Sequence, residues 1–289
     1  MSLKIIFNLK TITVYKMSEE QYINLLKDVM EHGEESQGRN AITKSLFAQH
    51  LKFDLRDGFP LLTTKKVPFK SIVEELLMFL RGQTNTQVLR DKNIHIWDGN
   101  TNKQFQDSNN LSHLDEWDMG WMYGKAFRDY DGVDQLMYCI NTIKTDPKSR
   151  RIVMTSFNPA KVKEGVLWPC HSMVLQFYVS NDGHLDLFCV NRSSDLFLGL
   201  PFNIASSALL LTIVAHLTNL KPRYFNLSLG DCHIYSNHYT QVEKQINRIL
   251  FTFPKLEVSC GNDLENIKCE EFKLVGYQSH PTIVGEMIP

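Results

Sequence analysis

The sequence lacks the usual marks of a zinc-binding, disulfide-bonded or polyanion-binding protein. Its 289 residues include six cysteines, none in a C-x-x-C pair, and several of them lie in apolar runs where reduced, buried thiols are expected. Lys and Arg number 31 against 32 Asp and Glu, so a formal charge of -1 gives no overall basic field. We therefore predict no metal and no nucleic-acid partner, although a local cluster of arginines could still bind one phosphate.

Long hydrophobic runs and a secretion signal are missing too. The longest apolar run, 205–217, has 13 residues and is interrupted by Ser206, Ser207 and His216, so it is too short to span a bilayer and predicts a core helix. Residues 1–16 mix Lys with apolar residues and contain no small-residue cleavage site. These features predict a cytoplasmic protein that does not interact with a membrane.

No repeat or Pro/Gly-rich linker divides the chain, and we predict one domain over 17–289 with an N-terminal extension of unknown role over 1–16. Periodicity predicts helices over 21–32, 71–80, 134–145, 202–220 and 239–250, and strands over 46–55, 152–157, 173–179, 185–190 and 224–229. The polar segments 36–45 and 98–120 are predicted as loops, the second long enough to suggest a functional role. This uneven mixture of helices and strands favours an α+β fold.

Cysteine and arginine residues provide the first candidates for chemistry. Cys170, in the segment Trp-Pro-Cys-His, is either a thiolate nucleophile with His171 beside it or an ordinary buried cysteine. The neighbours Arg150 and Arg151 fit a phosphate clamp or a solvated charge pair. Both pairs of alternatives stay open at this point.

Further polar residues lie beside apolar segments. Arg192 and Asp195 are costly there unless they pair with each other or bind a ligand. Asn203 is either a helix N-cap or a group that recognises a planar donor–acceptor edge. His233 and Tyr235 alternate on a predicted strand end and project the same way, to hold a sugar hydroxyl or to form a core pair.

Two other features concern the predicted core. Trp97, Trp121 and Trp168 are more typical of core positions than of a ligand platform. In the helix predicted over 71–80, Glu74 points away from the apolar stripe and Glu75 lies at its edge.

Each signal is short, but their order along the chain is specific. The pattern R-S-x-D-x-x-L-G leads into P-F-N-I-A-S over 192–206, and G-D-x-H-I-Y-x-N-H covers 230–238. Other matching segments are 59–85, 93–100, 122–130, 132–136, 149–162, 169–179, 253–256 and 277–287. Through these motifs the sequence resembles the thymidylate synthase family over about residues 20–289, and residues 1–16 have no counterpart in that pattern.

The resemblance implies a fold and a reaction. The fold would be a single α+β domain with a mixed β-sheet packed by helices, forming a sheet-to-sheet homodimer. The reaction would be the reductive methylation of dUMP to dTMP by a methyltransferase. Its co-substrate would be 5,10-methylenetetrahydrofolate, which gives the one-carbon unit and the hydride and leaves as dihydrofolate, with no metal.

The resemblance also implies catalytic roles. Cys170 would attack C6 of the uracil ring and form a covalent adduct. Glu75 would organise water for proton transfers, and Tyr123 would assist removal of the C5 proton. Asn203 would bond the pyrimidine N3–H and O4, and Asp195 would bond the pterin.

Binding residues follow in the same way. The implied dUMP ligands are Arg39, Arg150, Arg151, His171, Arg192, Ser193, Asn203, His233 and Tyr235. Of these, Arg39, Arg192 and Ser193 would hold the phosphate together with the partner subunit's Arg150 and Arg151, whereas His233 and Tyr235 would bind the ribose 3′-hydroxyl. The implied folate ligands are Ile96, Trp97, Asp195, Leu198, Gly199, Phe202 and Met287.

Departures from the family pattern keep other functions open. The segment 40–44 replaces a Gly/Thr-rich loop, Trp121, Trp168 and Asn191 replace the usual residues, and the chain ends at Pro289. A dUMP hydroxymethylase would use the same cysteine and folate but let water capture the methylene; the resemblance assigns Trp97 to shielding that carbon, which favours methylation. A third alternative, an inactive homologue that binds nucleotide or RNA, conflicts with the presence of every central catalytic residue.

Overall fold

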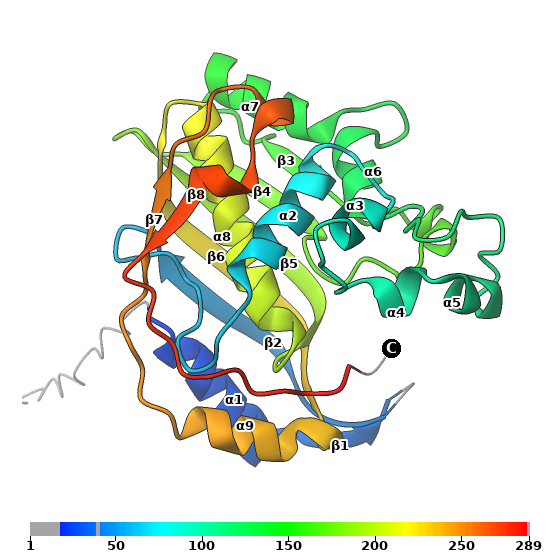
Figure 1. Cartoon of the computed structure of the whole chain (residues 1–289). Coiled ribbons are helices and arrows are strands. Elements are labelled where there is room, and N and C mark those ends of the chain that lie inside the picture. Colours follow the sequence, from blue (N-terminus) through cyan, green and yellow to red (C-terminus); the bar gives the residue numbers. More distant parts are fainter. Residues whose placement is uncertain (1–17, 39–40, 288–289) are drawn as a thin grey trace, which may run out of the picture.

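A mixed β-sheet forms the centre of the molecule (Figure 1). The computed structural model describes residues 18–38 and 41–287. Within that part of the chain the sheet has the order β1-β2-β6-β5-β4-β3; β5 and β6 run parallel and all other neighbours run antiparallel. Its strands are β1 Glu34–Gln37, β2 Ile42–Asp54, β3 Val153–Thr155, β4 Val174–Val179, β5 His184–Asp195 and β6 Lys221–Tyr235. The predicted α+β fold with a mixed sheet packed by helices is confirmed.

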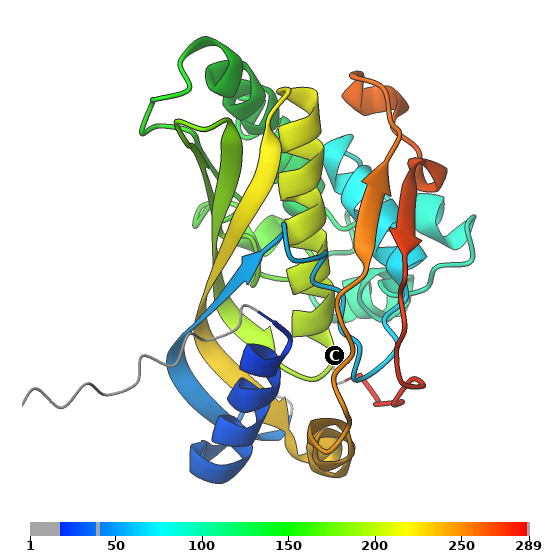
Figure 2. The ribbon, with the colours of Figure 1, turned by 90° about the vertical axis from the view of Figure 1, so that its left-hand side faces the viewer.

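Helices pack mainly on one face of this sheet, and a small second sheet lies farther out on that side (Figure 2). The helices are α1 Glu20–His32, α2 Phe69–Leu80, α3 Gln87–Arg90, α4 Asp98–Thr101, α5 Lys103–Ser108, α6 Tyr123–Arg128, α7 Gln135–Thr145, α8 Gly199–Leu217 and α9 Tyr239–Ile246. Short 3₁₀ turns are η1 Val162–Glu164, η2 Ser236–His238, η3 Leu264–Asn266 and η4 Cys269–Glu271. The strands β7 Lys255–Val258 and β8 Phe272–Val275 pair with each other, and α8 lies between them and the large sheet (Figure 2).

Helix α8 is the centre of the hydrophobic core. It packs on β5 and β6 with one side and on α2 with another, so it is apolar all around its circumference. Leu187 and Phe225 point from the sheet into this core and are fully buried. With 19 residues α8 is long and apolar enough to cross a membrane by composition alone, but most of it is buried inside the fold, as predicted for a core helix.

The opposite face of the sheet carries exposed apolar side chains. The register places Val153 opposite Gln176 and Gln176 opposite Phe188, so these residues share one face, and Tyr178 lies two residues along from Gln176. Val153 is 41% exposed and Tyr178 is 59% exposed. Such an uncovered apolar face is typical of an interaction surface.

The loop predictions were wrong in part. The polar residues of β1 are exposed and show no alternation, and they form a strand because they pair with β2, where Ser36 lies opposite Thr43. The segment 98–120 contains α4 and α5, and Asn102 caps α5 by accepting a hydrogen bond from the backbone N–H of Phe105 over 2.9 Å. The strands predicted over 185–190 and 224–229 are both longer, and β7 and β8 were missed. Residues 1–17 lie outside the described part, so the extension over 1–16 and the domain boundary stay predictions.

Candidate active site

The candidate residues meet at the carboxyl ends of β5 and β6. Because these strands are parallel, Ser193 lies beside Asp231, and Asp195 lies beside His233. The end of the 168–170 segment is bonded to β5, since the carbonyl oxygen of Cys170 accepts a hydrogen bond from the backbone N–H of Arg192 over 2.9 Å. The fold therefore brings together three motifs that lie far apart in the sequence.

A glycine makes this meeting point possible. Gly230 on β6 approaches the backbone of Arg192 so closely that a Cβ at this position would lie 2.5 Å from the Arg192 carbonyl oxygen. Any other residue would push β6 away from β5. The position of Arg192, and through it that of Cys170, therefore depends on the missing side chain.

The thiol of Cys170 is partly exposed and lies beside a buried phenol. Tyr123 Oη lies 3.8 Å from Cys170 Sγ and accepts a hydrogen bond from the Cys170 backbone N–H over 3.3 Å. Burial, together with the neighbouring Cys170, raises the pKa of Tyr123 well above its ordinary value, so its proton stays on the oxygen at neutral pH. Cys139, Cys189, Cys232 and Cys260 are buried, as predicted for cysteines of the apolar runs.

His171 supports Tyr123 instead of pairing with the thiol. Its ring stacks on the Tyr123 ring with centroids 4.0 Å apart, and its Nδ1 lies 3.1 Å from Ser172 Oγ. Burial lowers the pKa of His171 to about 4, so the imidazole is neutral at physiological pH. Within the described residues no hydrogen bond joins His171 to Cys170, so a cysteine–histidine ion pair is not present here.

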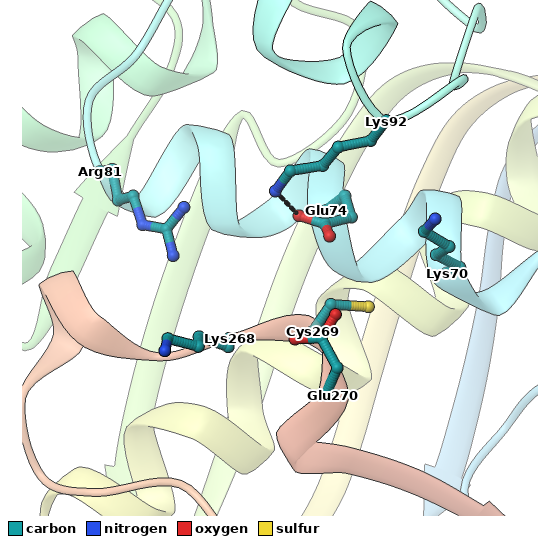
Figure 3. A pocket seen from close by; sticks show the side chains of 7 residues that line it. All are labelled: Lys70, Glu74, Arg81, Lys92, Lys268, Cys269 and Glu270. Carbon is teal, nitrogen blue, oxygen red and sulfur yellow. Dashed lines mark hydrogen bonds and ion pairs between the residues drawn. The ribbon is translucent and has the colours of Figure 1, made fainter.

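Glu75 is a buried carboxyl group that titrates near neutrality. It lies on α2, is 8% exposed, and accepts a hydrogen bond from Trp97 Nε1 over 2.7 Å. Burial raises the pKa of Glu75 to about 7, and the Trp97 hydrogen bond partly opposes this. Glu74 is buried as well and forms an ion pair with Lys92 (Figure 3). The prediction that it points away from the core gave its direction but missed its burial.

Asp195 shapes the turn that leads into α8. Its Oδ1 accepts hydrogen bonds from the backbone N–H groups of Phe197 and Leu198, over 2.9 and 3.1 Å. The buried Lys65, which sequence reasoning missed, donates a hydrogen bond to the Phe197 carbonyl oxygen. Burial lowers the pKa of Lys65 to about 8, and the charge of Asp195 opposes this. The local sequence signal for Lys65 is a lysine four residues before an apolar helix, which is too common to be informative.

Asn203 does not cap a helix. It lies in the second turn of α8, whose N-cap position is Leu198, so the N-cap interpretation was wrong. Within the described residues its half-buried side chain makes no hydrogen bond. His233 and Tyr235 do project the same way, as predicted, with ring centroids 5.0 Å apart, and His233 Nδ1 lies 2.6 Å from Asp231 Oδ1.

Apolar side chains and the C-terminal segment lie near the start of α8. Half-buried residues that pack against the core include Ile96, Trp97, Leu198 and Phe202. The Glu286 carbonyl oxygen accepts a hydrogen bond from His238 Nε2 over 2.8 Å, and the His238 ring contacts the Phe197 ring. The next residue, Met287, is 54% exposed. The assignment of these residues to a folate site stays a prediction.

The arginines predicted to bind the phosphate do not all lie near the Cys170 thiol. Arg192 donates hydrogen bonds to the carbonyl oxygens of Pro169 and Trp168, over 3.0 and 2.9 Å. Arg150 and Arg151 are exposed just before β3, and the described residues of this chain show no contact between them and Cys170. Arg39 lies outside the described residues.

Two tryptophan predictions have opposite outcomes. Trp121 is 6% exposed and belongs to the core, as predicted, and its ring meets the Tyr130 ring edge-on. Trp168 is 51% exposed, so its assignment to the core was wrong. Only its backbone carbonyl oxygen is tied down, by the hydrogen bond from Arg192.

Comparisons with known proteins agree with this geometry. A family model described as "Thymidylate synthase" matches residues 20–289. The thymidylate synthases of Mesoplasma florum and Mycoplasma genitalium are each 41% identical to this chain over 286 residues, which is 93% of the chain and 99% of each relative. The bifunctional dihydrofolate reductase-thymidylate synthase of Zea mays is 42% identical over 95% of this chain, and the chain spans 55% of that longer protein. The chain belongs to the thymidylate synthase family.

Proposed function

We propose that this chain converts dUMP to dTMP, with Cys170 as the nucleophile and 5,10-methylenetetrahydrofolate as co-substrate. The family membership supports the reaction, and a single observation supports the residue assignment: the Cys170 thiol is partly exposed and lies 3.8 Å from the buried Tyr123 hydroxyl. When bound, the folate supplies the one-carbon unit and the hydride. The comparisons name thymidylate synthases, so the hydroxymethylase alternative is not favoured.

The first step is the attack of Cys170 on the pyrimidine. A bond forms between Sγ and C6 of uracil, and the electron pair of the C5–C6 double bond moves onto C5 and O4. The thiolate form is needed for this attack, and cationic groups and hydrogen bonds nearby favour it. Arg192 is held beside this segment, because it donates hydrogen bonds to the carbonyl oxygens of Trp168 and Pro169, the two residues before Cys170.

Proton transfers then involve Glu75 and Tyr123. A carboxyl group with a pKa of about 7 is populated in both forms at neutral pH, so Glu75 can give a proton to a water near O4 and take it back. Tyr123 keeps its proton, and it therefore relays the C5 proton through its hydroxyl without acting as a strong base. The two groups reach the ring from different helices, α2 and α6.

Substrate recognition uses the ends of β5, β6 and α8. Asn203 presents an amide with both a donor and an acceptor, which matches the N3–H and O4 edge of uracil. Arg192 and Ser193 hold the phosphate, and His233 and Tyr235, which project the same way, bind the ribose 3′-hydroxyl. Ile96, Trp97, Asp195, Leu198, Gly199, Phe202 and Met287 form the folate surface.

A homodimer completes the phosphate site in this proposal. The uncovered sheet face, with Val153, Tyr178 and Phe188, is apolar and suits a second copy of the same face. Arg150 and Arg151 directly precede β3 at the edge of that sheet. Packing two such sheets together would let each chain contribute its two arginines to the site of the other. We also propose that this enzyme works in the cytoplasm.

One incubation tests the reaction. The protein is mixed with dUMP and methylenetetrahydrofolate, the nucleotide is examined by mass spectrometry, and dihydrofolate is followed by its absorbance. A methyl-mass product with an equal amount of dihydrofolate would support the proposal. A hydroxymethyl-mass product without dihydrofolate would instead favour water capture, and no change in dUMP would contradict both. The Cys170→Ser variant is the control and should lose at least about 10³-fold in turnover.

A further inference from the structure

The residue two positions after the proposed nucleophile has an unusual backbone conformation. Ser172 has a φ angle of 51°, in the left-handed region that residues other than glycine rarely adopt. It is 7% exposed, and side chains bind both of its backbone polar groups. Its N–H donates to Asn191 Oδ1 over 3.0 Å, and its carbonyl oxygen accepts a hydrogen bond from Ser156 Oγ over 3.0 Å. The neighbouring segments therefore hold Ser172 in a strained conformation.

This conformation brings the Ser172 side chain to its neighbour His171. In an extended strand the side chains of consecutive residues point to opposite faces. Here, however, Ser172 Oγ lies 3.1 Å from His171 Nδ1, which is within hydrogen-bond distance. The His171 ring is also fixed on one of its faces, because it stacks on Tyr123. The left-handed turn therefore places a hydroxyl group at one nitrogen of the ring that follows Cys170 in the chain.

The hydrogen bond between Ser172 and His171 can run in two directions. His171 is neutral near pH 7, so only one of its ring nitrogens carries a proton. If Nδ1 carried it, Nδ1–H would donate to Ser172 Oγ, and the buried hydroxyl would have only the weakly accepting Cys189 thiol left among the described residues. If Ser172 donates to Nδ1, its hydroxyl has a strong acceptor. The second direction is favoured, because a buried donor without a good acceptor is costly.

The direction of this bond determines what the other ring nitrogen can do. When Nδ1 accepts, the ring proton lies on Nε2. His171 Nε2 makes no hydrogen bond within the described residues and is not closed off from solvent, so a ligand can reach it. Its ring stacks on Tyr123, whose hydroxyl lies 3.8 Å from the Cys170 thiol. His171 therefore adds an N–H donor to the candidate active site.

We propose that Ser172 is a positioning residue, whose hydroxyl keeps the His171 proton on Nε2 so that this N–H donates to the pyrimidine during the attack of Cys170. Negative charge moves onto the pyrimidine in that step, and a donor that is already oriented stabilises such charge. The effect on turnover rests on the proposed function. The position of the proton does not, because it is a property of the free protein.

Nitrogen NMR of the full-length protein, labelled with nitrogen-15 in histidine, measures the position of the proton. The chain has ten histidines, and comparison with the His171→Gln spectrum identifies the signals of His171. At pH 7, Nδ1 should resonate as an unprotonated ring nitrogen and Nε2 as a protonated one. In Ser172→Ala the ratio of the Nδ1–H form to the Nε2–H form should rise about tenfold, because Nδ1 loses its donor, and the two signals should move toward each other.

Two further variants separate the hydroxyl from the backbone and from a general loss of a buried serine. Ser172→Gly removes the hydroxyl and also relieves the strain of the positive φ angle, so it should give the same shift as Ser172→Ala. Ser180 is a buried serine on the far side of β4, and it bonds Asp182 and the His184 carbonyl oxygen instead of His171. Ser180→Ala should therefore leave the His171 signals unchanged.

A double-mutant cycle connects the proton to turnover. Ser172→Ala should lower kcat about fivefold with little change in KM for dUMP, because the oriented donor is partly lost. In a His171→Gln background the same substitution should have no further effect, since Ser172 acts only through the imidazole. Additive effects of the two substitutions would show that Ser172 acts through the fold and would contradict its positioning role.

Other results would also overturn the proposal. A protonated Nδ1 in the wild-type protein would reverse the direction of the hydrogen bond. Unchanged His171 signals in both Ser172→Ala and Ser172→Gly would show that the hydroxyl does not set the proton. A normal kcat in Ser172→Ala would remove the link to the reaction. If the wild-type protein did not convert dUMP at all, the proposed function would fail, and the NMR result would still decide where the proton lies.

Discussion

Trp97 Nε1 donates a hydrogen bond of 2.7 Å to Glu75 Oε1, and this bond joins a proposed folate contact to a proposed proton-transfer group. Glu75 comes from α2, whereas Trp97 precedes α4, so the pair connects two segments that pack together only in the fold. The bond favours the ionised carboxylate, and burial disfavours it. The balance leaves the pKa of Glu75 at about 7, which suits a group that must both give and take a proton.

Replacing Trp97 should shift this balance. In Trp97→Phe the carboxylate loses its indole donor, so the pKa of Glu75 rises and the pH profile of kcat moves to higher pH by about one unit. Trp117→Phe is the control, because Trp117 stacks on Arg90 and has no contact with Glu75. The value of kcat will also fall if Trp97 contacts the folate. The quantity to compare is therefore the pH at which kcat changes, and not the size of kcat. An unshifted profile would mean that the hydrogen bond does not tune Glu75.

Glu75 should also lower the stability of the protein at alkaline pH. The folded-state pKa of about 7 lies above the ordinary value of 4.5, so the folded protein binds the proton more tightly than the unfolded chain. Wild-type stability should therefore fall by about 3 kcal/mol as the pH rises from 4.5 through 7 and stay constant above that. Glu75→Gln should remove this dependence while abolishing turnover, because the amide oxygen can still accept from Trp97 but cannot titrate.

Urea unfolding at pH 5 and pH 8 measures the effect. The gain in stability of Glu75→Gln over wild type should be larger at pH 8 than at pH 5 by about 2.5 kcal/mol, because a small part of the effect is already present at pH 5. Glu257→Gln, which changes an exposed carboxylate on β7, should show no such difference. The same difference in both variants would indicate a general charge effect instead of the burial of Glu75.

Removing the Tyr123 hydroxyl separates catalysis from packing. Tyr123→Phe keeps the ring that stacks on His171, so the fold should lose only about 1 kcal/mol, from the hydrogen bond of the Cys170 N–H. The proton relay disappears, so kcat should fall about a hundredfold or more while KM for dUMP changes little. Steady-state kinetics with dUMP varied provides the measurement. A rise in KM with unchanged kcat would assign Tyr123 to binding.

Much of the fold could be predicted from the sequence because its central elements have strong periodicity. The helix around Ser71 to Leu80, the core helix and five strands were recognised by apolar patterns and by β-branched and aromatic content. Strand β1 could not be, because its residues are exposed on both faces and it exists only through pairing with β2. The helices α4 and α5 are short, and side-chain caps such as Asn102 stabilise them, which leaves no apolar period to detect.

Less of the candidate site than of the fold could be predicted from the sequence. His233 and Tyr235 were placed together correctly because alternation on a strand is a local rule. The contact between Tyr123 and Cys170 joins residues 47 positions apart, and no local pattern contains it. Lys65 was missed for the same reason, since its meaning comes from its bond to the Phe197 carbonyl oxygen. The motifs identified which residues matter, and the parallel pairing of β5 and β6 determines how they meet.

The proposed exchange of arginines between subunits can be tested by mixing two inactive proteins. One is Cys170→Ser and the other is Arg150→Ala/Arg151→Ala. If each site takes its cysteine from one chain and these arginines from the other, a mixed dimer has one complete site. Equal mixing and refolding should therefore restore about a quarter of wild-type activity, because about half of the dimers are mixed and each has one working site of two.

A matched mixture excludes a trivial explanation. Cys170→Ser mixed with Tyr123→Phe should show no more activity than the two proteins separately, because Cys170 and Tyr123 lie 3.8 Å apart in one chain and no mixed dimer has both in the same site. Recovery in both mixtures would indicate wild-type contamination. Recovery in neither would mean that Arg150 and Arg151 serve their own subunit, and the exposed face with Val153, Tyr178 and Phe188 would then need another partner.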